Sequence, residues 1–151
     1  MGMPDDQYKL LVAGNLLFMA LDEPAREEVV KLARVVNYSR GDVIIQQGAE
    51  DEDIYLVRQG SVDVRTLEGG FIVELTTLGP GSLVGEVAEV SNVRRTATVV
   101  AAGQVEALRF PGPQLVAEMR KHPAASDLLD QIVLKRAQDT IKKTLGDEDD
   151  G

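Results

Sequence analysis

Residues 37–111 consist of short β-branched runs separated by glycines, and this pattern constrains the fold more than any other feature of the chain. β-Branched residues favour strands and glycines favour turns, so a repeat of about ten residues predicts an antiparallel sandwich or barrel. Glu68, Gly69 and Gly70 have the composition of a hairpin turn. Residues 85–91 lack the alternation and predict a short helix between two strands. The runs predicted as strands are 43–45, 54–57, 62–64, 71–75, 96–100 and 105–110.

The stretch before the strands, residues 5–36, has helical periodicity in its leucines. Asp22 followed by Pro24 is typical of a helix start, because an aspartate side chain caps free N–H groups and proline suits the first turn. The apolar face of this second helix is predicted to continue to Val36.

The stretch after the strands also predicts helices. Pro113 favours a short helix that runs to Lys121, and Pro123 interrupts it. Residues 124–145 predict a longer helix with two apolar stripes. One stripe can pack on the strands, and the other offers a surface for a partner, such as the same helix of a second copy. Residues 146–151 are acidic and are predicted to be a disordered tail.

Composition excludes several classes of function. The chain has 151 residues, no cysteine, one histidine and a net charge of −9. The lack of cysteine excludes disulfides, thiolate zinc sites and a cysteine nucleophile. The single histidine, His122, disfavours histidine-rich metal sites and a histidine-based triad, so we expect no enzyme, no metal and no cofactor. The acidic charge opposes binding to nucleic acid and to anionic membranes.

The apolar residues 10–21 are too few to span a bilayer, and acidic rather than basic residues precede them. This predicts a cytoplasmic protein without a targeting signal.

Residues 79–99 contain the parts of an anion site. Gly85 lets the backbone approach a ligand at the start of the predicted short helix, whose N–H groups favour a phosphate. Arg95 can return on the next strand to neutralise that charge, and Thr96 adds a hydroxyl donor. The carboxylate of Glu86 would repel a bare phosphate but can accept hydrogen bonds from sugar hydroxyls. A phosphate beside a sugar hydroxyl describes a nucleotide.

The same segment resembles the phosphate-binding cassette of the cyclic nucleotide-binding domain family, which includes catabolite activators and regulatory subunits of protein kinase A. The family pattern is Phe-Gly-Glu-Leu-Ala, about six variable residues, and then Arg-(Ala/Ser/Thr)-Ala. This chain has Val-Gly-Glu-Val-Ala at 84–88, six residues, and then Arg-Thr-Ala at 95–97. The resemblance extends over most of the chain, from Leu17 through the Arg-Gly-Asp-Val-Ile run at 40–44 to the C-terminal helices.

The resemblance implies a mainly β protein, an eight-stranded antiparallel β-roll (a jelly-roll-like barrel) with N-terminal helices and C-terminal lid helices. One domain is expected over 1–145, with helices in 5–36, the β-roll in 37–111 and helices in 113–145. No DNA-binding or catalytic segment is expected with it. The implied function is that of a bacterial-style sensor that binds cAMP or cGMP and acts by movement of its C-terminal helices on an unknown protein effector.

The resemblance also implies roles for particular residues. Arg95, Thr96 and the backbone of Gly85, Val87 and Ala88 would bind the cyclic phosphate. Glu86 would bind the ribose 2′-hydroxyl, and Glu52 would orient Arg95 in the empty site. The residues expected to cover the base are Leu129, Ile132, Val133 and Arg136. Substitutions of Arg95 and Glu86 are expected to leave the fold intact.

Three residues depart from the family pattern. Val84 replaces phenylalanine, Arg94 replaces a common proline, and Glu89 stands where an aliphatic residue is usual. Glu89 either faces solvent or adds negative charge near the phosphate.

Two other functions therefore stay open. One is a vestigial member of the family that serves as a protein-interaction scaffold. The other is a metal-dependent enzyme of the cupin-like barrel class, which the single histidine disfavours.

Overall fold

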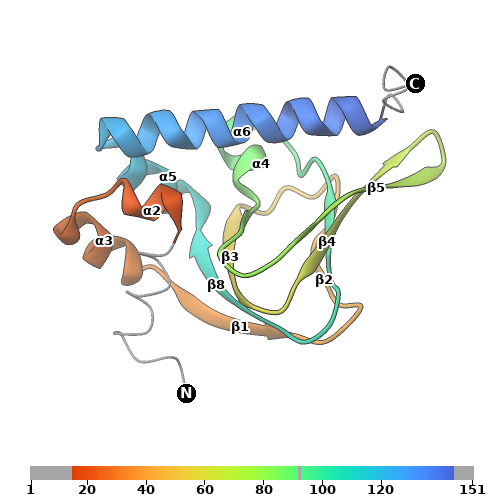
Figure 1. Cartoon of the computed structure of the whole chain (residues 1–151), viewed down its shortest axis with the longest axis horizontal. Coiled ribbons are helices and arrows are strands. Elements are labelled where there is room, and N and C mark those ends of the chain that lie inside the picture. Colours follow the sequence, from red (N-terminus) through yellow and green to blue (C-terminus); the bar gives the residue numbers. More distant parts are fainter. Residues whose placement is uncertain (1–14, 92, 145–151) are drawn as a thin grey trace.

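A computed structural model describes residues 15–91 and 93–144, and its centre is a pair of antiparallel sheets (Figure 1). One sheet has the strand order β1-β8-β3-β6 and the other β2-β7-β4-β5. The eight strands confirm the predicted antiparallel β-roll, but the two sheets do not close into a barrel. The strands are β1 Arg34–Tyr38, β2 Val43–Ile45, β3 Asp53–Gln59, β4 Val62–Glu68, β5 Phe71–Leu78, β6 Leu83–Val84, β7 Thr98–Ala101 and β8 Val105–Pro111.

Two hydrophobic clusters hold the fold together. One lies between the sheets and includes Tyr55 and Val62. The other joins the β1-β8-β3-β6 sheet to the helices, and in it the rings of Phe18 and Phe110 stack with their centroids 5.7 Å apart. Both phenylalanines are fully buried, and burial of such a side chain contributes about 1.5–3 kcal/mol. The sheet that carries the site is therefore fixed to the helices by side chains from both ends of the chain.

The second helix before the strands is shorter than the periodicity predicts. Helix α2 spans Leu16–Met19 and helix α3 spans Glu23–Val30. The Asp22 side chain accepts a hydrogen bond from the Ala25 backbone N–H, which confirms the predicted cap. The predicted continuation to residue 36 is wrong, because strand β1 already begins at Arg34 and pairs with β8. Pairing with β8 makes residues 34–38 a strand, and the spacing of apolar residues alone does not indicate this pairing.

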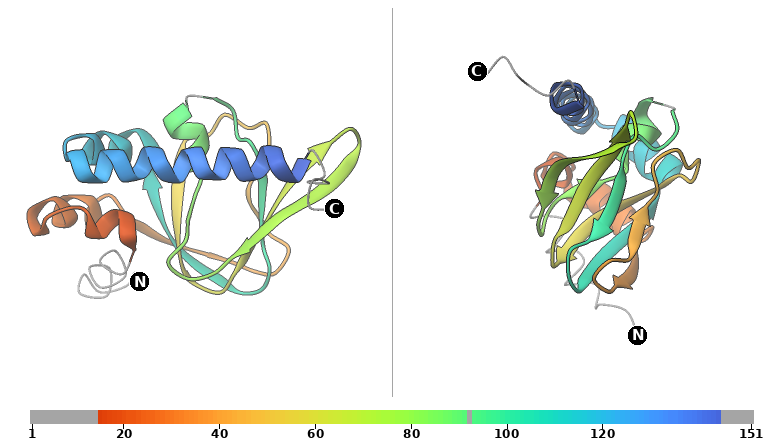
Figure 2. Two further views of the ribbon diagram at one scale, coloured as in Figure 1. Left: turned by 45° about the horizontal axis from the view of Figure 1, so that its top comes forward. Right: turned by 90° about the vertical axis from the view of Figure 1, so that its right-hand side faces the viewer.

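Two helices follow the strands. Helix α5 spans Gly112–Arg120, and the 22-residue helix α6 spans Pro123–Thr144. The break between them confirms the predicted role of Pro123. Helix α6 runs along one side of the roll and passes over α4 (Glu86–Ser91) towards the β4–β5 hairpin (Figures 1 and 2). The predicted tail and residues 5–14 lie outside the described residues.

Among the described residues, no helix is both long enough and apolar enough to cross a membrane.

Candidate functional site

The site is built around the turn from β6 into α4. Gly85 makes this turn with a backbone φ of +97°, a conformation that only glycine adopts without strain. A Cβ atom at this position would lie 2.8 Å from Nη1 of Arg95 and 2.8 Å from the carbonyl oxygen of Asp53. Glycine is therefore required here both for its conformation and for the close approach of the Arg95 side chain.

Arg95 is buried beneath this turn, with 3% of its surface exposed. Its Nε and Nη2 donate to the two carboxylate oxygens of Asp51 at 3.3 and 2.7 Å. Its Nη1 donates to the Gly85 carbonyl at 3.1 Å, and Nη2 donates to the Asp53 carbonyl at 2.6 Å. A guanidinium group that is buried, paired and aimed at the glycine turn is positioned before any ligand arrives.

The prediction that Glu52 orients Arg95 is wrong, because Asp51 makes this contact. The hydrogen bond from Arg95 lowers the pKa of Asp51 below its usual value of 3.8. Residues 50–53 are all acidic, so the sequence contains the right kind of residue in the right loop. Which of these four residues contacts Arg95 depends on the path of the loop into β3. No pattern in the sequence indicates that path.

Glu86 is fully buried at the start of α4. Its Oε2 forms an ion pair with Nη1 of Arg136 at 2.6 Å, and the same Arg136 nitrogen donates to the Leu83 carbonyl. Its Oε1 is also buried, and none of the described residues donates a hydrogen bond to it. Burial raises the pKa of Glu86 against the opposing charge of Arg136. A buried carboxylate with one free oxygen can accept one more hydrogen bond.

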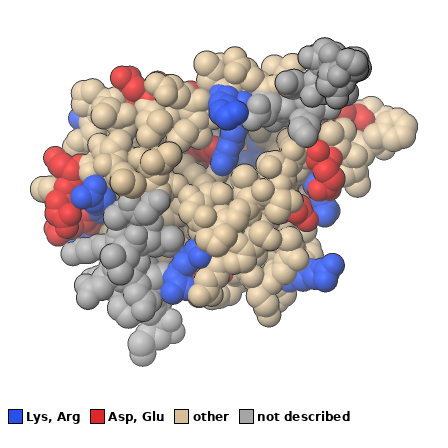
Figure 3. Space-filling view, in the orientation of Figure 1, with Lys and Arg blue, Asp and Glu red and all other residues tan. Residues whose placement is uncertain are grey.

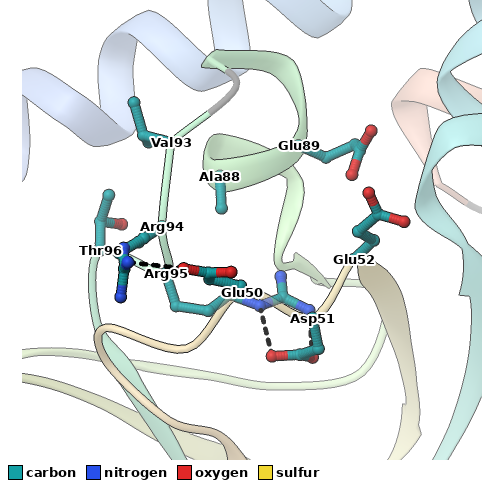
Figure 4. Close-up of a pocket in the computed structure, with 9 residues that line it drawn as sticks. All are labelled: Glu50, Asp51, Glu52, Ala88, Glu89, Val93, Arg94, Arg95 and Thr96. Atoms are coloured by element: carbon teal, nitrogen blue, oxygen red, sulfur yellow. Dashed lines mark hydrogen bonds and ion pairs between the residues drawn. The ribbon is translucent and has the colours of Figure 1, made fainter.

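A pocket of about 790 Å³ opens beside Arg95 (Figure 4). Predicted residues Ala88, Arg95 and Thr96 line it, whereas Gly85 and Glu86 do not. Gly85 instead accepts from Arg95, Val87 lies in α4, and Glu86 is covered by Arg136. The described residues that line the pocket are Glu50, Asp51, Glu52, Ala88, Glu89, Val93, Arg94, Arg95 and Thr96.

The predicted base lid does not cover the pocket in this structure. Leu129 and Val133 are buried in the cluster that joins the sheet to the helices, and Ile132 packs against the same cluster. Arg136 contacts Glu86 and Leu83. The rotation of α6 about its axis turns these apolar side chains towards α2 and α5, and the sequence alone does not set that rotation.

Sequence reasoning also missed how the acidic residues of the pocket are arranged. Glu50 pairs with Arg94 at 2.6 Å, and Asp51 pairs with Arg95. The side chains of Glu52 and Glu89 point towards each other on the opposite wall (Figure 4). The departure of Glu89 from the family pattern was the one available signal of this arrangement. Its neighbour Glu52 is 37 positions away in the sequence, so the pattern did not indicate their proximity.

The face shown in Figure 3 indicates how charged side chains are distributed on the described surface. Acidic side chains gather there over α3, and basic side chains are scattered among uncharged ones. This distribution agrees with the net charge of −9 and offers no continuous basic surface on that face.

Comparisons with known proteins bear on this geometry. The sequence model described as "Cyclic nucleotide-binding domain" matches residues 35–122. A cAMP-dependent protein kinase regulatory subunit from Candida albicans is 31% identical over 139 residues, which cover 88% of this chain and 29% of that protein. The chain spans 20–29% of the length of the first curated relatives it matches. Those relatives come from fungi and a fly, so a bacterial style of module stays a prediction.

Solved structures share the fold. The regulatory domain of Toxoplasma gondii PKA, crystallised with cAMP, has a TM-score of 0.80 at 21% identity over 87% of this chain and 50% of that one. The regulatory subunit of a cAMP-independent protein kinase A from Trypanosoma brucei has a TM-score of 0.77 at 23% identity over 85% of this chain and 45% of that one. At these identities the likeness establishes the fold alone. The fold therefore occurs both in a domain that was crystallised with cAMP and in a subunit of a kinase that is described as cAMP-independent.

Proposed function

Because the chain belongs to the cyclic nucleotide-binding domain family, we propose that it is a regulatory module that binds cAMP or cGMP and catalyses no reaction. The observation that carries the proposal is the buried pair of opposite functional groups at the Gly85 turn. Arg95 offers a prepositioned cation for a cyclic phosphate, and Glu86 offers a buried carboxylate oxygen that lacks a donor. A ribose hydroxyl next to a phosphate supplies both complements.

The pocket supports the phosphate half of this proposal directly. Ala88 of the cassette and Thr96, which carries a hydroxyl group, line it beside Arg95. Four of the five N–H groups of Arg95 are already engaged by Asp51, Gly85 and Asp53. A phosphate must therefore share or displace these acceptors, and the cassette and the loop before β3 respond together.

The ribose half requires movement of α6. Glu86 is not exposed to the pocket while Arg136 lies against it. A sugar hydroxyl that binds Glu86 therefore competes with Arg136, and α6 shifts when Arg136 gives way. A ligand that binds the displaced arrangement more tightly changes the population of the two states. A tenfold preference corresponds to about 1.4 kcal/mol, and an effective switch needs a few times that.

Leu129, Ile132 and Val133 would reach the base only after such a shift, because they now pack in the core. We keep them as the proposed lid of the bound state. An α6 that moves with the ligand can transmit the signal to a protein effector or to a second copy of the chain. Leu134 on α6 is 59% exposed and belongs to the surface that such a partner would cover. We place the module in the cytoplasm, in line with the absence of cysteine.

One observation favours the alternative of a scaffold that binds no nucleotide. Among the described residues of the lining, four carry carboxylates and two carry guanidinium groups, so this part of the lining is acidic although the expected ligand is an anion. The two functions make opposite predictions for ligand binding by the folded protein.

Isothermal titration with cAMP and separately with cGMP decides between them. The protein is first stripped of ligand by unfolding and refolding, and its fold is verified by circular dichroism. Saturable binding near one nucleotide per chain supports the sensor, and the ratio of the two affinities identifies its ligand. Absence of heat with both nucleotides from folded protein overturns the sensor in favour of the scaffold.

A further inference from the structure

Four of the described residues that line the pocket carry carboxylates, and two of these are Glu52 and Glu89. Glu50 is paired with Arg94 and Asp51 with Arg95, which uses both guanidinium groups of the lining. Within the part of the chain that the structure describes, Glu52 and Glu89 form no ion pair. The wall of the pocket that carries Glu52 and Glu89 is therefore negatively charged.

The fold brings the backbone of Glu52 and the carboxylate of Glu89 together at Gly112, the first residue of α5. A Cβ atom at position 112 would overlap the carbonyl oxygen of Glu52 and lie 3.0 Å from Oε1 of Glu89. Only glycine lets the loop before β3 and the side chain from α4 approach this point together. In the close-up the two carboxylates point towards each other on the side of the pocket away from Arg94 and Thr96 (Figure 4).

The pKa of Glu89 reflects the charged groups around it. Burial raises the pKa of Glu89, the negative charge of Glu52 raises it further, and Arg95 acts in the opposite direction. Glu89 therefore lies within electrostatic reach of the same guanidinium group that is proposed to hold the phosphate.

We infer that Glu89, together with Glu52, is a specificity-determining residue that weakens the binding of anions in proportion to their charge and so favours the singly charged cyclic phosphate over doubly charged 5′-monophosphates. This inference rests on the proposed function, because it assigns a role within the same pocket. The interaction energy between a fixed charge and a ligand is proportional to the ligand charge. Removal of one carboxylate therefore changes the affinity for a dianion by about the square of the factor for a monoanion.

The test compares wild type with Glu89→Gln, which keeps the shape of the side chain and removes its charge. Affinities are measured by titration at pH 8 and low salt for whichever of cAMP and cGMP binds wild type more tightly. The matched 5′-monophosphate is measured by competition. We expect the variant to bind the cyclic nucleotide about three- to tenfold more tightly and to discriminate less against the 5′-monophosphate. The gain should shrink in about 0.5 M salt, where charges are screened within a few ångströms.

Glu68→Gln is the matched control, because Glu68 is an exposed carboxylate at the end of β4 that does not line the pocket. It removes the same net charge and should leave both affinities unchanged. Glu52→Gln should reproduce the gain of Glu89→Gln. Each variant is verified as folded by circular dichroism.

The outcomes separate this inference from the proposed function. If wild type binds a cyclic nucleotide and Glu89→Gln binds it no more tightly, or if Glu68→Gln gains as much, the role of Glu89 is overturned and the sensor stands. An unchanged preference against the 5′-monophosphate, or no competition by it in either protein, overturns the selection by charge. If neither folded wild type nor folded Glu89→Gln binds cAMP or cGMP, the proposed function itself fails.

Discussion

Arg136 of α6 and Glu86 of α4, fifty positions apart in the sequence, form an ion pair with 2.6 Å between Nη1 and Oε2. The Glu86 side chain is 1% exposed and the Arg136 side chain 30%. The carboxylate that is proposed to bind ribose is thus held by the helix that is proposed to move. Removal of either partner should affect both stability and ligand binding.

Arg136→Met should destabilise the fold, because it leaves the buried charge of Glu86 without its partner. Loss of one member of a fully buried pair costs about 3–5 kcal/mol, and the partial exposure of Arg136 reduces this to about 2–4 kcal/mol. Urea unfolding of Arg136→Met, Glu86→Gln and the double variant gives the coupling energy of the pair. A coupling energy near zero would contradict the ion pair.

Arg120→Met is the matched control for this cycle. Arg120 of α5 pairs with Asp130 of α6 at 2.9 Å, but both side chains are more exposed, at 36% and 57%. Its loss should cost less than about 1 kcal/mol, as is typical of surface ion pairs. If Arg120→Met and Arg136→Met lower the free energy of unfolding equally, burial of Glu86 is not the cause of the loss in Arg136→Met.

Arg95→Lys should lose cyclic nucleotide binding and also part of the stability of the fold. Lysine keeps the charge but cannot reproduce the fork of donors that reaches Asp51, Gly85 and Asp53. We expect binding to weaken by about 2–5 kcal/mol by titration. Arg95 and Glu86 are both buried, so the expectation that their variants stay folded remains a prediction that circular dichroism of the variants tests. Arg94→Ala, which removes the exposed neighbouring guanidinium, should change stability by less than about 1 kcal/mol.

Gly85→Ala should be more damaging than Gly81→Ala. Both glycines have positive φ, +97° and +91°, so an alanine is strained by about 1–2 kcal/mol at either position. At Gly81 no atom lies within 4 Å of the added Cβ, whereas at Gly85 the Cβ meets Arg95 and Asp53. Crowding should add about 1–3 kcal/mol at Gly85 alone. Thermal or urea unfolding measures the difference, and equal losses would show that the close approach to Arg95 has no energetic weight.

The pair between Asp51 and Arg95 should make stability depend on pH in acid. The hydrogen bond from Arg95 lowers the pKa of Asp51 in the folded chain below 3.8. The group therefore stabilises the fold above its unfolded pKa, and this contribution is lost as the pH falls through the folded-state pKa. The difference in free energy of unfolding between wild type and Asp51→Asn should be constant above about pH 5 and shrink below about pH 4.

Urea unfolding at stepped pH measures that difference, with Glu68→Gln as a control for the loss of one exposed charge. A difference that stays constant into strong acid would show that Asp51 is not the acceptor that holds Arg95.

Much of this architecture can be predicted from residues that are close together in the sequence. Alternation and glycine spacing predicted six of the described strands within a few residues, but they did not predict β6 at Leu83–Val84. The cap at Asp22 and the break at Pro123 could be predicted from residue chemistry. Failures occurred where distant pairing competes with periodicity. The segment that begins at Arg34 looked helical because its apolar residues suit either structure, but β8 pairs with it as a strand.

The sequence by itself determined the glycine turn, the carboxylate after it and the arginine that returns ten residues later, because these groups are linked by a short, fixed length of chain. The tertiary structure decided which of four consecutive acidic residues meets Arg95. It also decided that Arg136 lies against Glu86 while Leu129 and Val133 pack in the core. Those choices depend on the shift of a loop and the rotation of a helix relative to residues far away in the chain, and such rigid-body positions follow from packing of the whole core rather than from any local pattern.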